Sequence, residues 1–329
     1  MSWMSTWTAL VVILGLSVAV SECQETMQGG EVAKDAMALI QLGDTHSDRS
    51  EYTQAIALYE QALALQREAQ DRAGEGRTLT RLGQAYMALS QYKRALALAE
   101  EALTLHREVH NRRDEGITLS TLGLIYTWLS QYKRAIALSE EALAIHREVH
   151  NRRDEGSTLS NLGRTYAALS QYERAIAVYE QALTIHREVS NRRDEGITLS
   201  RLGGAYAALS QYERAIAVSE QALTIHCEGS NRRFEGSTLS TLGLVYAQQS
   251  QYERAIAIYE QALTIHREVH DRRDEGIALN RLGIAYKELS QYERAIAVYE
   301  QALTIHREVS NRWGEGIALS NLVQRFVSP

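Results

Sequence analysis

The sequence of 329 residues predicts an all-α fold, a right-handed α-solenoid built from antiparallel helix pairs. The dipeptide Leu-Gly returns with a strict period of 40 residues, which is typical of stacked units that cannot bury their apolar faces alone. No proline precedes Pro329, and the repeats are rich in residues compatible with helices. We therefore expect one solenoid of seven helix pairs over residues 31–329, with repeats centred on Gly43, Gly83, Gly123, Gly163, Gly203, Gly243 and Gly283.

An apolar stripe predicts the first helix of each repeat. In the fourth repeat, EGSTLSNLGRTYAALS, the stripe consists of Leu159, Leu162, Tyr166 and Leu169, which recur at helical spacing. Gly163 lies inside this helix, where glycine costs about 1 kcal/mol relative to alanine. Its return from repeat to repeat indicates that a second helix approaches closely there.

A capping box predicts where the second helix begins. Ser170-Gln171-Tyr172-Glu173 has the S-x-x-E form, in which the serine hydroxyl bonds an amide of the first turn and the glutamate reaches back. The apolar stripe of this second helix consists of Ala175, Ile176, Tyr179, Ala182 and Leu183. We expect the small alanines to lie where the two helices meet.

Residues 106–116, HREVHNRRDEG, are predicted to connect one helix pair to the next. The run from His106 forms the last, solvated turn of a second helix, where histidine favours the negative helix end. Asn111 either closes that helix in a left-handed conformation or caps the following one. Asp114 then supplies negative charge to the first turn of the following helix.

The same histidines raise the alternative of a metal site. The i, i+4 pairs are His106/His110, His146/His150 and His266/His270. The order H-R-E-V-H differs from the H-E-x-x-H of zinc proteases, no third ligand is indicated, and serine replaces the second histidine in other repeats. We predict no metal and no cofactor, and keep a metal-binding or hydrolytic protein using these connectors as a minor alternative.

The run Leu162-Gly163-x-x-Tyr166, followed by Ala175, Tyr179 and Ala182, resembles the tetratricopeptide repeat. The resemblance covers most of the chain, and the 40-residue period is similar to the long repeats of kinesin light chains, Pins-type adaptors and bacterial regulators. It implies a superhelix in which the first helix of each repeat lines a concave groove. The resemblance also implies that peptides or partner helices bind in that groove.

The resemblance places the groove on first-helix positions that lie opposite the buried stripe. The residues expected to line it are Arg77, Arg81, Gln84, Thr121, Leu124, Trp128, Asn161, Arg164, Arg201, Thr241, Leu244, Asn280, Arg281, Ile284, Lys287 and Asn321. The whole chain carries a net charge of -6, yet this surface is rich in arginine. Because a guanidinium holds a carboxylate with two hydrogen bonds, we predict an acidic peptide or a C-terminal carboxylate as ligand.

Composition and missing motifs exclude further classes of function. A net charge of -6 and a pI near 6.0 give no overall attraction to nucleic acid, and two cysteines exclude a disulfide framework. The sequence shows no nucleophile elbow and no phosphate-binding loop. We predict a non-enzymatic scaffold for protein–protein interaction, with a regulatory or sensor array acting on a separately encoded effector as the alternative.

The first 21 residues are predicted to be a signal peptide, because an apolar run at 9–20 leads to small residues at Ala19 and Ser21. Residues 22–30 then form a polar leader. This predicts an exported protein, periplasmic or secreted. No Lys or Arg precedes the run, so an uncleaved membrane anchor or a cytoplasmic product is the alternative, and membrane contact is expected only through this segment.

Residues 316–327 are predicted to be a capping helix, an eighth first helix without a partner. Val323 takes the glycine position there, where no following helix needs close approach. The helix is more apolar than an ideal cap, which leaves homodimerisation through this end open.

Overall fold

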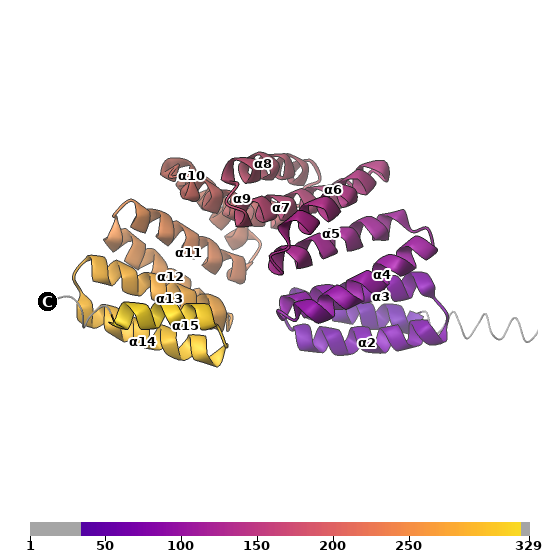
Figure 1. Ribbon diagram of the computed structural model, residues 1–329, viewed down its shortest axis with the longest axis horizontal. Coiled ribbons are helices and arrows are strands. Elements are labelled where there is room, and N and C mark those ends of the chain that lie inside the picture. Colours follow the sequence, from indigo (N-terminus) through magenta and orange to yellow (C-terminus); the bar gives the residue numbers. More distant parts are fainter. Residues whose placement is uncertain (1–33, 324–329) are drawn as a thin grey trace, which may run out of the picture. The chain divides into compact units, whose positions relative to one another are not determined.

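The structure, a computed structural model, describes residues 34–323 (Figure 1). Within that range the chain forms helices joined by three-residue turns and contains no strand, so the predicted all-α fold is confirmed. Residues 34–48 are helical and come first. The helices that follow are α2 Tyr52–Glu68, α3 Arg72–Ala88, α4 Tyr92–Glu108, α5 Arg112–Trp128, α6 Tyr132–Glu148, α7 Arg152–Ala168, α8 Tyr172–Glu188, α9 Arg192–Ala208, α10 Tyr212–Glu228, α11 Arg232–Gln248, α12 Tyr252–Glu268, α13 Arg272–Glu288, α14 Tyr292–Glu308 and α15 Arg312–Val323.

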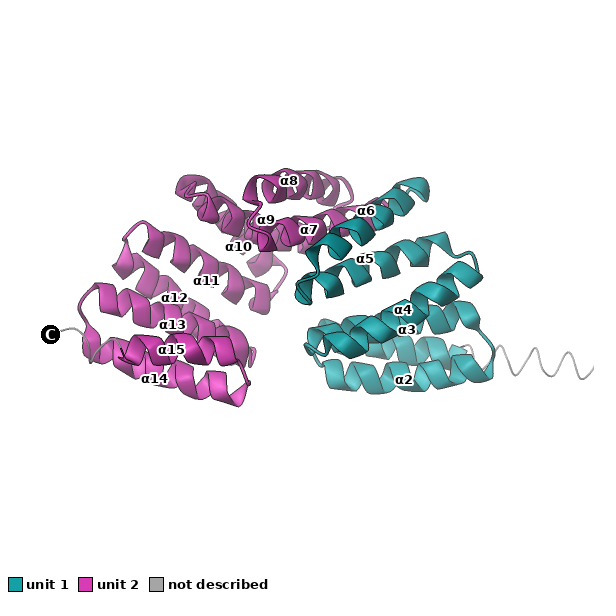
Figure 2. Ribbon diagram, in the orientation of Figure 1, with its two compact units in different colours: residues 1–150 teal, residues 151–329 magenta. Residues whose placement is uncertain are grey.

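The helices pair in chain order. We call residues 34–48 and the odd-numbered helices A helices, and the even-numbered ones B helices. Each of α3, α5, α7, α9, α11 and α13 packs against the B helix that follows it, and α15 packs on α14. The described residues thus hold the predicted helix pairs and a final unpaired A helix. The chain divides into two compact units at residues 150 and 151, and each unit is described by itself (Figure 2).

Neighbouring A helices also touch within each unit. In the first unit α3 contacts α5, and in the second unit α7, α9, α11, α13 and α15 contact one another in succession. Serine and threonine hydroxyls join them, for example Thr80 to Thr118 at 2.9 Å and Ser200 to Thr238 at 2.6 Å. One face of each unit is therefore formed by adjacent A helices.

Glycine sets the distance between an A helix and its B helix. A Cβ on Gly163 would lie 2.6 Å from Cε1 of Tyr179, closer than any real contact allows. Tyr179 is 2% exposed, and Ala175 and Ala182 are fully buried beside it. The close helix approach predicted at this glycine is confirmed, although Leu169 at the end of the apolar stripe is only half-buried.

The predicted capping box is wrong. Ser170 has φ 58° and is the left-handed residue that closes α7. The amide of Gln171 donates to the carbonyl of Tyr166 at 2.9 Å, and that of Ser170 to Ala167 at 2.9 Å, which together form a Schellman motif. Gln171 is the N-cap of α8 and makes no side-chain capping bond. The serine therefore ends one helix and does not begin the next.

The connector after each B helix uses two residues for the two roles that the sequence left open. His110 adopts the left-handed conformation, with φ 54°. Asn111 caps α5, because its Oδ1 accepts from the amide of Asp114 at 3.2 Å and its Nδ2 donates to the Asp114 carboxylate at 2.7 Å. Asp114 lies in the first turn of α5, as predicted.

The prediction of a solvated histidine near the end of the B helix is wrong. The six histidines at this position are completely buried: His106, His146, His186, His226, His266 and His306. The His226 ring packs on Gly196 of the preceding A helix, where an added Cβ would lie 2.8 Å from Cε1. Burial lowers the pKa of His226 to about 4, so its imidazole is neutral at pH 7.

The arginines and carboxylates of the connector form ion pairs between repeats. Glu115, on α5, is 5% exposed and accepts from Arg107 Nε at 2.9 Å and from Arg112 Nη1 at 2.7 Å. Arg112 also reaches Glu148 on α6 at 2.9 Å. Burial alone raises the pKa of Glu115, but the hydrogen bonds from the two arginines lower it below its ordinary value. A buried carboxylate is thus kept charged by two partners, as its burial requires.

The last A helix, α15, begins at Arg312, four residues before the predicted start of the capping helix. Asn311 precedes it, just as Asn or Asp precedes each of the A helices from α3 to α13. Its predicted end, residues 324–327, lies outside the described residues. Trp313 is 73% exposed, at a position that is also exposed in the other A helices from α5 onward. Val323 is 55% exposed at the repeat-glycine position, where no described B helix follows to cover it. Homodimerisation through this end stays a prediction.

The predicted signal peptide, residues 1–21, and the leader, residues 22–30, lie outside the described residues. Among the helices of residues 34–323, none is both long and apolar enough to cross a membrane. Export, or anchoring by the N-terminal segment, stays a prediction.

The glycine contact generates a stability prediction with a matched control. Gly163→Ala is expected to lower the free energy of unfolding by about 2 kcal/mol, since the new methyl group displaces Tyr179. Gly204→Ala, one position later in its repeat, has nothing within 4 Å of the new Cβ and should raise that free energy by up to about 1 kcal/mol. Urea unfolding followed by circular dichroism measures both. Equal effects at the two positions would contradict the packing role of Gly163.

The buried histidines predict a loss of stability in mild acid. Above pH 6.5 the His226 imidazole is neutral in both the folded and the unfolded chain. Between pH 6.5 and about 4 it binds a proton in the unfolded chain but not in the folded one, which favours unfolding. At pH 5 this costs about 2 kcal/mol for His226 alone. Urea unfolding at pH 7 and pH 5 should show the decline, and His226→Gln should reduce it. A decline of the same size in the variant would show that His226 is not responsible.

Candidate binding surface

The sixteen residues predicted to line a groove are all on A helices, and we call them the A-helix surface. In the first unit they lie on α3 and α5, namely Arg77, Arg81, Gln84, Thr121, Leu124 and Trp128. In the second unit they lie on α7, α9, α11, α13 and α15, namely Asn161, Arg164, Arg201, Thr241, Leu244, Asn280, Arg281, Ile284, Lys287 and Asn321. Because successive A helices touch within a unit, these residues follow one face of each unit.

A hollow of about 460 Å³ opens on the A-helix surface of the first unit, and Arg77, Arg81 and Gln84 line it. Asp44 also lines the hollow and pairs with Arg81, whose Nε lies 2.9 Å from Oδ1. Arg77 lies 3.9 Å from the carboxylate of Asp114. Carboxylates of the chain therefore already face both arginines of this hollow.

Two residues of the predicted surface are buried, so their assignment to an open groove is wrong. Thr121 is 6% exposed, and its hydroxyl accepts from Gln84 Nε2 at 3.2 Å between α3 and α5. Asn280 is 5% exposed, and its Nδ2 lies 3.0 Å from His306 Nε2 and 3.3 Å from the carbonyl oxygen of Gly314. Both hold helices together, because contacts between neighbouring A helices cover part of the face that a single helical wheel leaves open.

The arginines of the second unit have a different environment. Arg201 donates from Nη1 to Ser160 Oγ at 2.8 Å, and Arg281 donates from Nη1 to the carbonyl oxygen of Ser240 at 3.2 Å. Both reach back to the preceding A helix. Burial lowers the pKa of Arg201, with Tyr179 and Asp194 opposing that effect. Within residues 34–323 neither arginine has an ion-pair partner.

The remaining positions offer apolar and polar contact area. Ile284 is 40% exposed, and Trp128 is 38% exposed with its ring stacked on Tyr92 at 5.9 Å between centroids. Gln84 is exposed. The half-buried members are Leu124, Asn161, Arg164, Thr241, Leu244, Lys287 and Asn321. The surface is therefore mixed in character, with its open apolar positions at Trp128 and Ile284.

Sequence reasoning missed a second hollow, of about 580 Å³, on the B helices of the first unit. It lies between α2, α3 and α4, where Tyr86 donates to Glu60 at 3.2 Å and the Arg94 guanidinium lies 5.7 Å from the Tyr86 ring centre. A tyrosine and an arginine eight residues apart return in later repeats, and this pattern could have indicated the contact. Because cation–π pairs of this kind recur in other repeats, we interpret them as packing between an A helix and the B helix that follows it.

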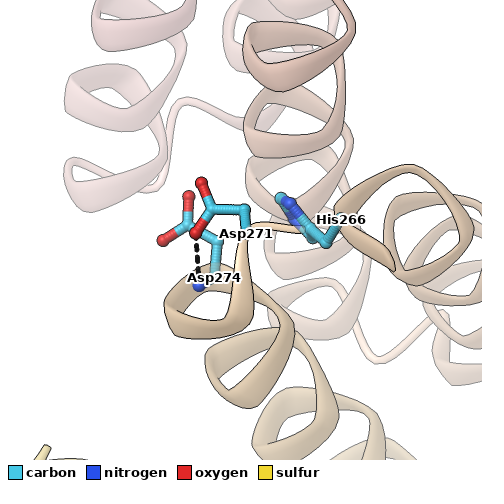
Figure 3. Close-up of side chains that lie close together, drawn as sticks. All are labelled: His266, Asp271 and Asp274. Carbon is cyan, nitrogen blue, oxygen red and sulfur yellow. Dashed lines mark hydrogen bonds between the residues drawn. The ribbon is translucent and has the colours of Figure 1, made fainter. Parts of the chain in front are cut away.

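One group of side chains has the composition of a metal site. His266, Asp271 and Asp274 bring one possible ligand atom each within 4.8 Å of the others, at the turn between α12 and α13 (Figure 3). Asp271 stands where most other repeats have the capping asparagine. Its Oδ1 accepts from the amide of Asp274 at 3.2 Å, and its Oδ2 pairs with Arg233 Nε at 2.8 Å. Both oxygens of Asp271 are thus already engaged, one of them by a cation.

The described fold and its repeats match known proteins. The sequence profile of the tetratricopeptide repeat family matches residues 34–108, 114–188, 154–228, 194–268 and 234–308. No match is found among curated proteins.

Solved structures share the fold. A Rap protein in complex with Competence and Sporulation Factor aligns with a TM-score of 0.71 and 14% identity, over 84% of this chain and 76% of the Rap chain. The Rap conjugation gene regulator of plasmid pLS20, in complex with the Phr* peptide, aligns with a TM-score of 0.65 and 16% identity, over 82% of this chain and 74% of the regulator. A signal-transduction ATPase with a tetratricopeptide repeat sensor from Pyrococcus horikoshii aligns with a TM-score of 0.62 and 17% identity, over 89% of this chain and 46% of the ATPase.

At these identities the structural likeness shows the fold alone. The family profile, by contrast, matches most of the sequence, and its repeats coincide with the helix pairs described above. The chain therefore belongs to the tetratricopeptide repeat family.

Proposed function

We propose that this protein is a non-enzymatic scaffold that binds a peptide or a partner helix on the A-helix surface. The family and the fold support a role in protein interaction or regulation. The observation that carries the proposal is the row of adjacent A helices, whose outward side chains include arginines with no ion-pair partner in the described residues. Arg201 and Arg281 each donate to a neutral oxygen of the preceding A helix, and an acidic ligand would give their guanidinium groups a charged partner.

The proposed ligand is acidic. In the first unit Asp44 and Asp114 already face the arginines of the hollow, but in the second unit Arg201 and Arg281 make hydrogen bonds only to neutral oxygens. A carboxylate binds a guanidinium more strongly than a neutral acceptor does. A structural neighbour, the Rap conjugation regulator, was solved with a peptide bound, which supports the use of this fold for peptide recognition.

The alternative is a regulatory array that acts with a separately encoded effector. One structural neighbour carries its tetratricopeptide repeats as a sensor within a larger signal-transduction ATPase, and the match covers 46% of that chain. The alternative uses the same surface and differs in what the bound partner does. Capture of partners from the source cell, with activity assays of those partners, distinguishes the two.

The location of the surface is tested with a peptide found by array screening. Gln84→Asp and Ile284→Asp place a charge at exposed positions of α3 and α13. At least one of them is expected to weaken binding about tenfold, equivalent to about 1.4 kcal/mol, in fluorescence anisotropy. Ala297→Asp, at an exposed position of α14, is the matched control and should change affinity less than twofold. Loss of binding only in the control would move the site to the B helices.

The minor alternative of a metal protein is tested at His266, Asp271 and Asp274. Zinc titration by calorimetry at pH 7 is expected to show no stoichiometric binding, because Arg233 already neutralises Asp271. Asp271→Asn restores the residue of most other repeats and serves as the comparison. One tight zinc site in the natural chain that disappears in this variant would favour the metal alternative.

A further inference from the structure

The first unit contains a carboxylate held by a tyrosine and an arginine. Tyr59 on α2 donates its hydroxyl proton to Asp44 Oδ1 at 2.7 Å, and Arg81 on α3 donates from Nε to the same oxygen at 2.9 Å. Asp44 follows the repeat glycine Gly43, and the Tyr59 ring packs on that glycine, where an added Cβ would lie 2.5 Å from Cε1. We call these three residues the carboxylate triad.

The second unit repeats the tyrosine and the arginine but not the carboxylate. Tyr179 is 120 residues after Tyr59 and packs on Gly163 in the same way, at 2.6 Å from an added Cβ. Arg201 is 120 residues after Arg81, and Arg164 stands where Asp44 stands in the first unit. In the described part of the chain the Tyr179 hydroxyl has no hydrogen-bond partner, and Arg201 bonds only Ser160.

Within this chain the arginine occurs only together with the tyrosine, although Tyr299 also packs on its repeat glycine and is followed by Asn321 at the arginine position. Arginine stands two positions before the repeat glycine at Arg81, Arg201 and Arg281, and each time the preceding B helix carries tyrosine at the position that packs on glycine, namely Tyr59, Tyr179 and Tyr259. In the repeats where that position is Ala99 or Ser219, the partner position is Thr121 or Thr241. The arginine therefore accompanies the tyrosine, as expected for two donors to one acceptor.

Burying the Tyr179 hydroxyl without an acceptor is unfavourable, and Arg201 has only a neutral acceptor, Ser160 Oγ. Tyr179 is 2% exposed, and burial raises its pKa while the charges of Arg201 and Arg164 oppose the rise. The hydroxyl of Tyr179 is not completely enclosed, unlike that of Tyr299. An unpaired buried donor lowers stability, and a carboxylate oxygen placed between the two groups gives both donors a charged acceptor.

We propose that Tyr179, Arg201 and Arg164 form an anion subsite that receives one carboxylate of a bound peptide, in the position that Asp44 fills in the first unit. The proposal rests on peptide binding to the A-helix surface and adds its chemical specificity. Tyr179 and Arg201 donate to one carboxylate oxygen, as Tyr59 and Arg81 do to Asp44, and Arg164 adds a second positive charge.

A related pair lies two repeats later in the sequence and has fewer positive charges. Tyr259 and Arg281 repeat the two donors, but Leu244 stands where Arg164 stands, so only one cation is present. Arg281 also donates to the Ser240 carbonyl oxygen. The carboxylate is therefore assigned to the subsite of Tyr179.

The first experiment uses no ligand. Arg164→Asp supplies the carboxylate from the chain itself and is expected to raise the midpoint of thermal unfolding by about 2 °C. Arg164→Asn is the matched control, because it has the same size and also removes the repulsion between Arg164 and Arg201. The unfolding midpoint of Arg164→Asp should exceed that of Arg164→Asn, and this difference should vanish when Arg201→Gln is added to both variants. Equal midpoints for Asp and Asn, with Arg201 intact, overturn the subsite.

The second experiment uses three probe peptides with the full chain. They are acetyl-Ala-Ala-Glu-Ala-Ala-amide, its Gln counterpart, and acetyl-pentaalanine with a free C-terminal carboxylate. Saturation-transfer NMR should give at least about fivefold tighter binding for a carboxylate probe than for the Gln probe, a modest charge-assisted preference. Arg201→Gln should abolish the preference. Whichever carboxylate probe is favoured identifies the side chain or the C-terminus as the source.

The outcomes separate this inference from the proposed function. If the Gln probe binds as well as the others and Arg201→Gln changes nothing, the subsite is wrong while peptide binding to the A-helix surface stands. If no peptide binds the A-helix surface but Arg164→Asp stabilises the chain through Arg201, the anion subsite is supported and the proposed function fails.

Discussion

The contact on which the rest of each repeat depends is that between a glycine of the A helix and a side chain of its B helix. At Gly163 the Tyr179 ring occupies the volume of an absent Cβ, and at Gly156, nearer the other end of the same helix pair, the His186 ring lies 3.0 Å from the position of an added Cβ. Two such contacts fix both the distance and the rotation of the two helices. Every residue that faces the neighbouring repeat or the solvent takes its direction from that arrangement.

Charge in the connectors then links one pair to the next. Glu115 is buried at the start of an A helix and binds Arg107 from the preceding B helix together with Arg112 from its own. A buried carboxylate with two charged donors holds its surroundings in one geometry, because loss of either donor leaves the buried charge less well compensated. The sequence HREVHNRRDEG thus combines a buried histidine, a helix end, a cap and an ion pair within eleven residues.

The glycine contact also gives the A-helix surface its chemistry. By packing the ring of Tyr59 or Tyr179 on glycine, it brings the hydroxyl to the residue after that glycine and to the arginine of the next repeat. In the first unit that residue is Asp44 and the donors are satisfied within the chain. In the second unit it is Arg164, so a packing feature shared by both units provides a closed contact in one and a candidate ligand contact in the other.

The sequence by itself determined the helix pairs, their 40-residue period and the close approach at Gly163, because apolar periodicity and the recurrence of glycine are local properties of the chain. Only the tertiary structure decided that His226 is buried, that Ser170 ends a helix and that Thr121 and Asn280 lie between helices. It also decided which arginines face a carboxylate. Arg81 meets Asp44 across 37 positions of sequence, and a contact at that separation depends on the spacing between neighbouring A helices, which no single helical wheel contains.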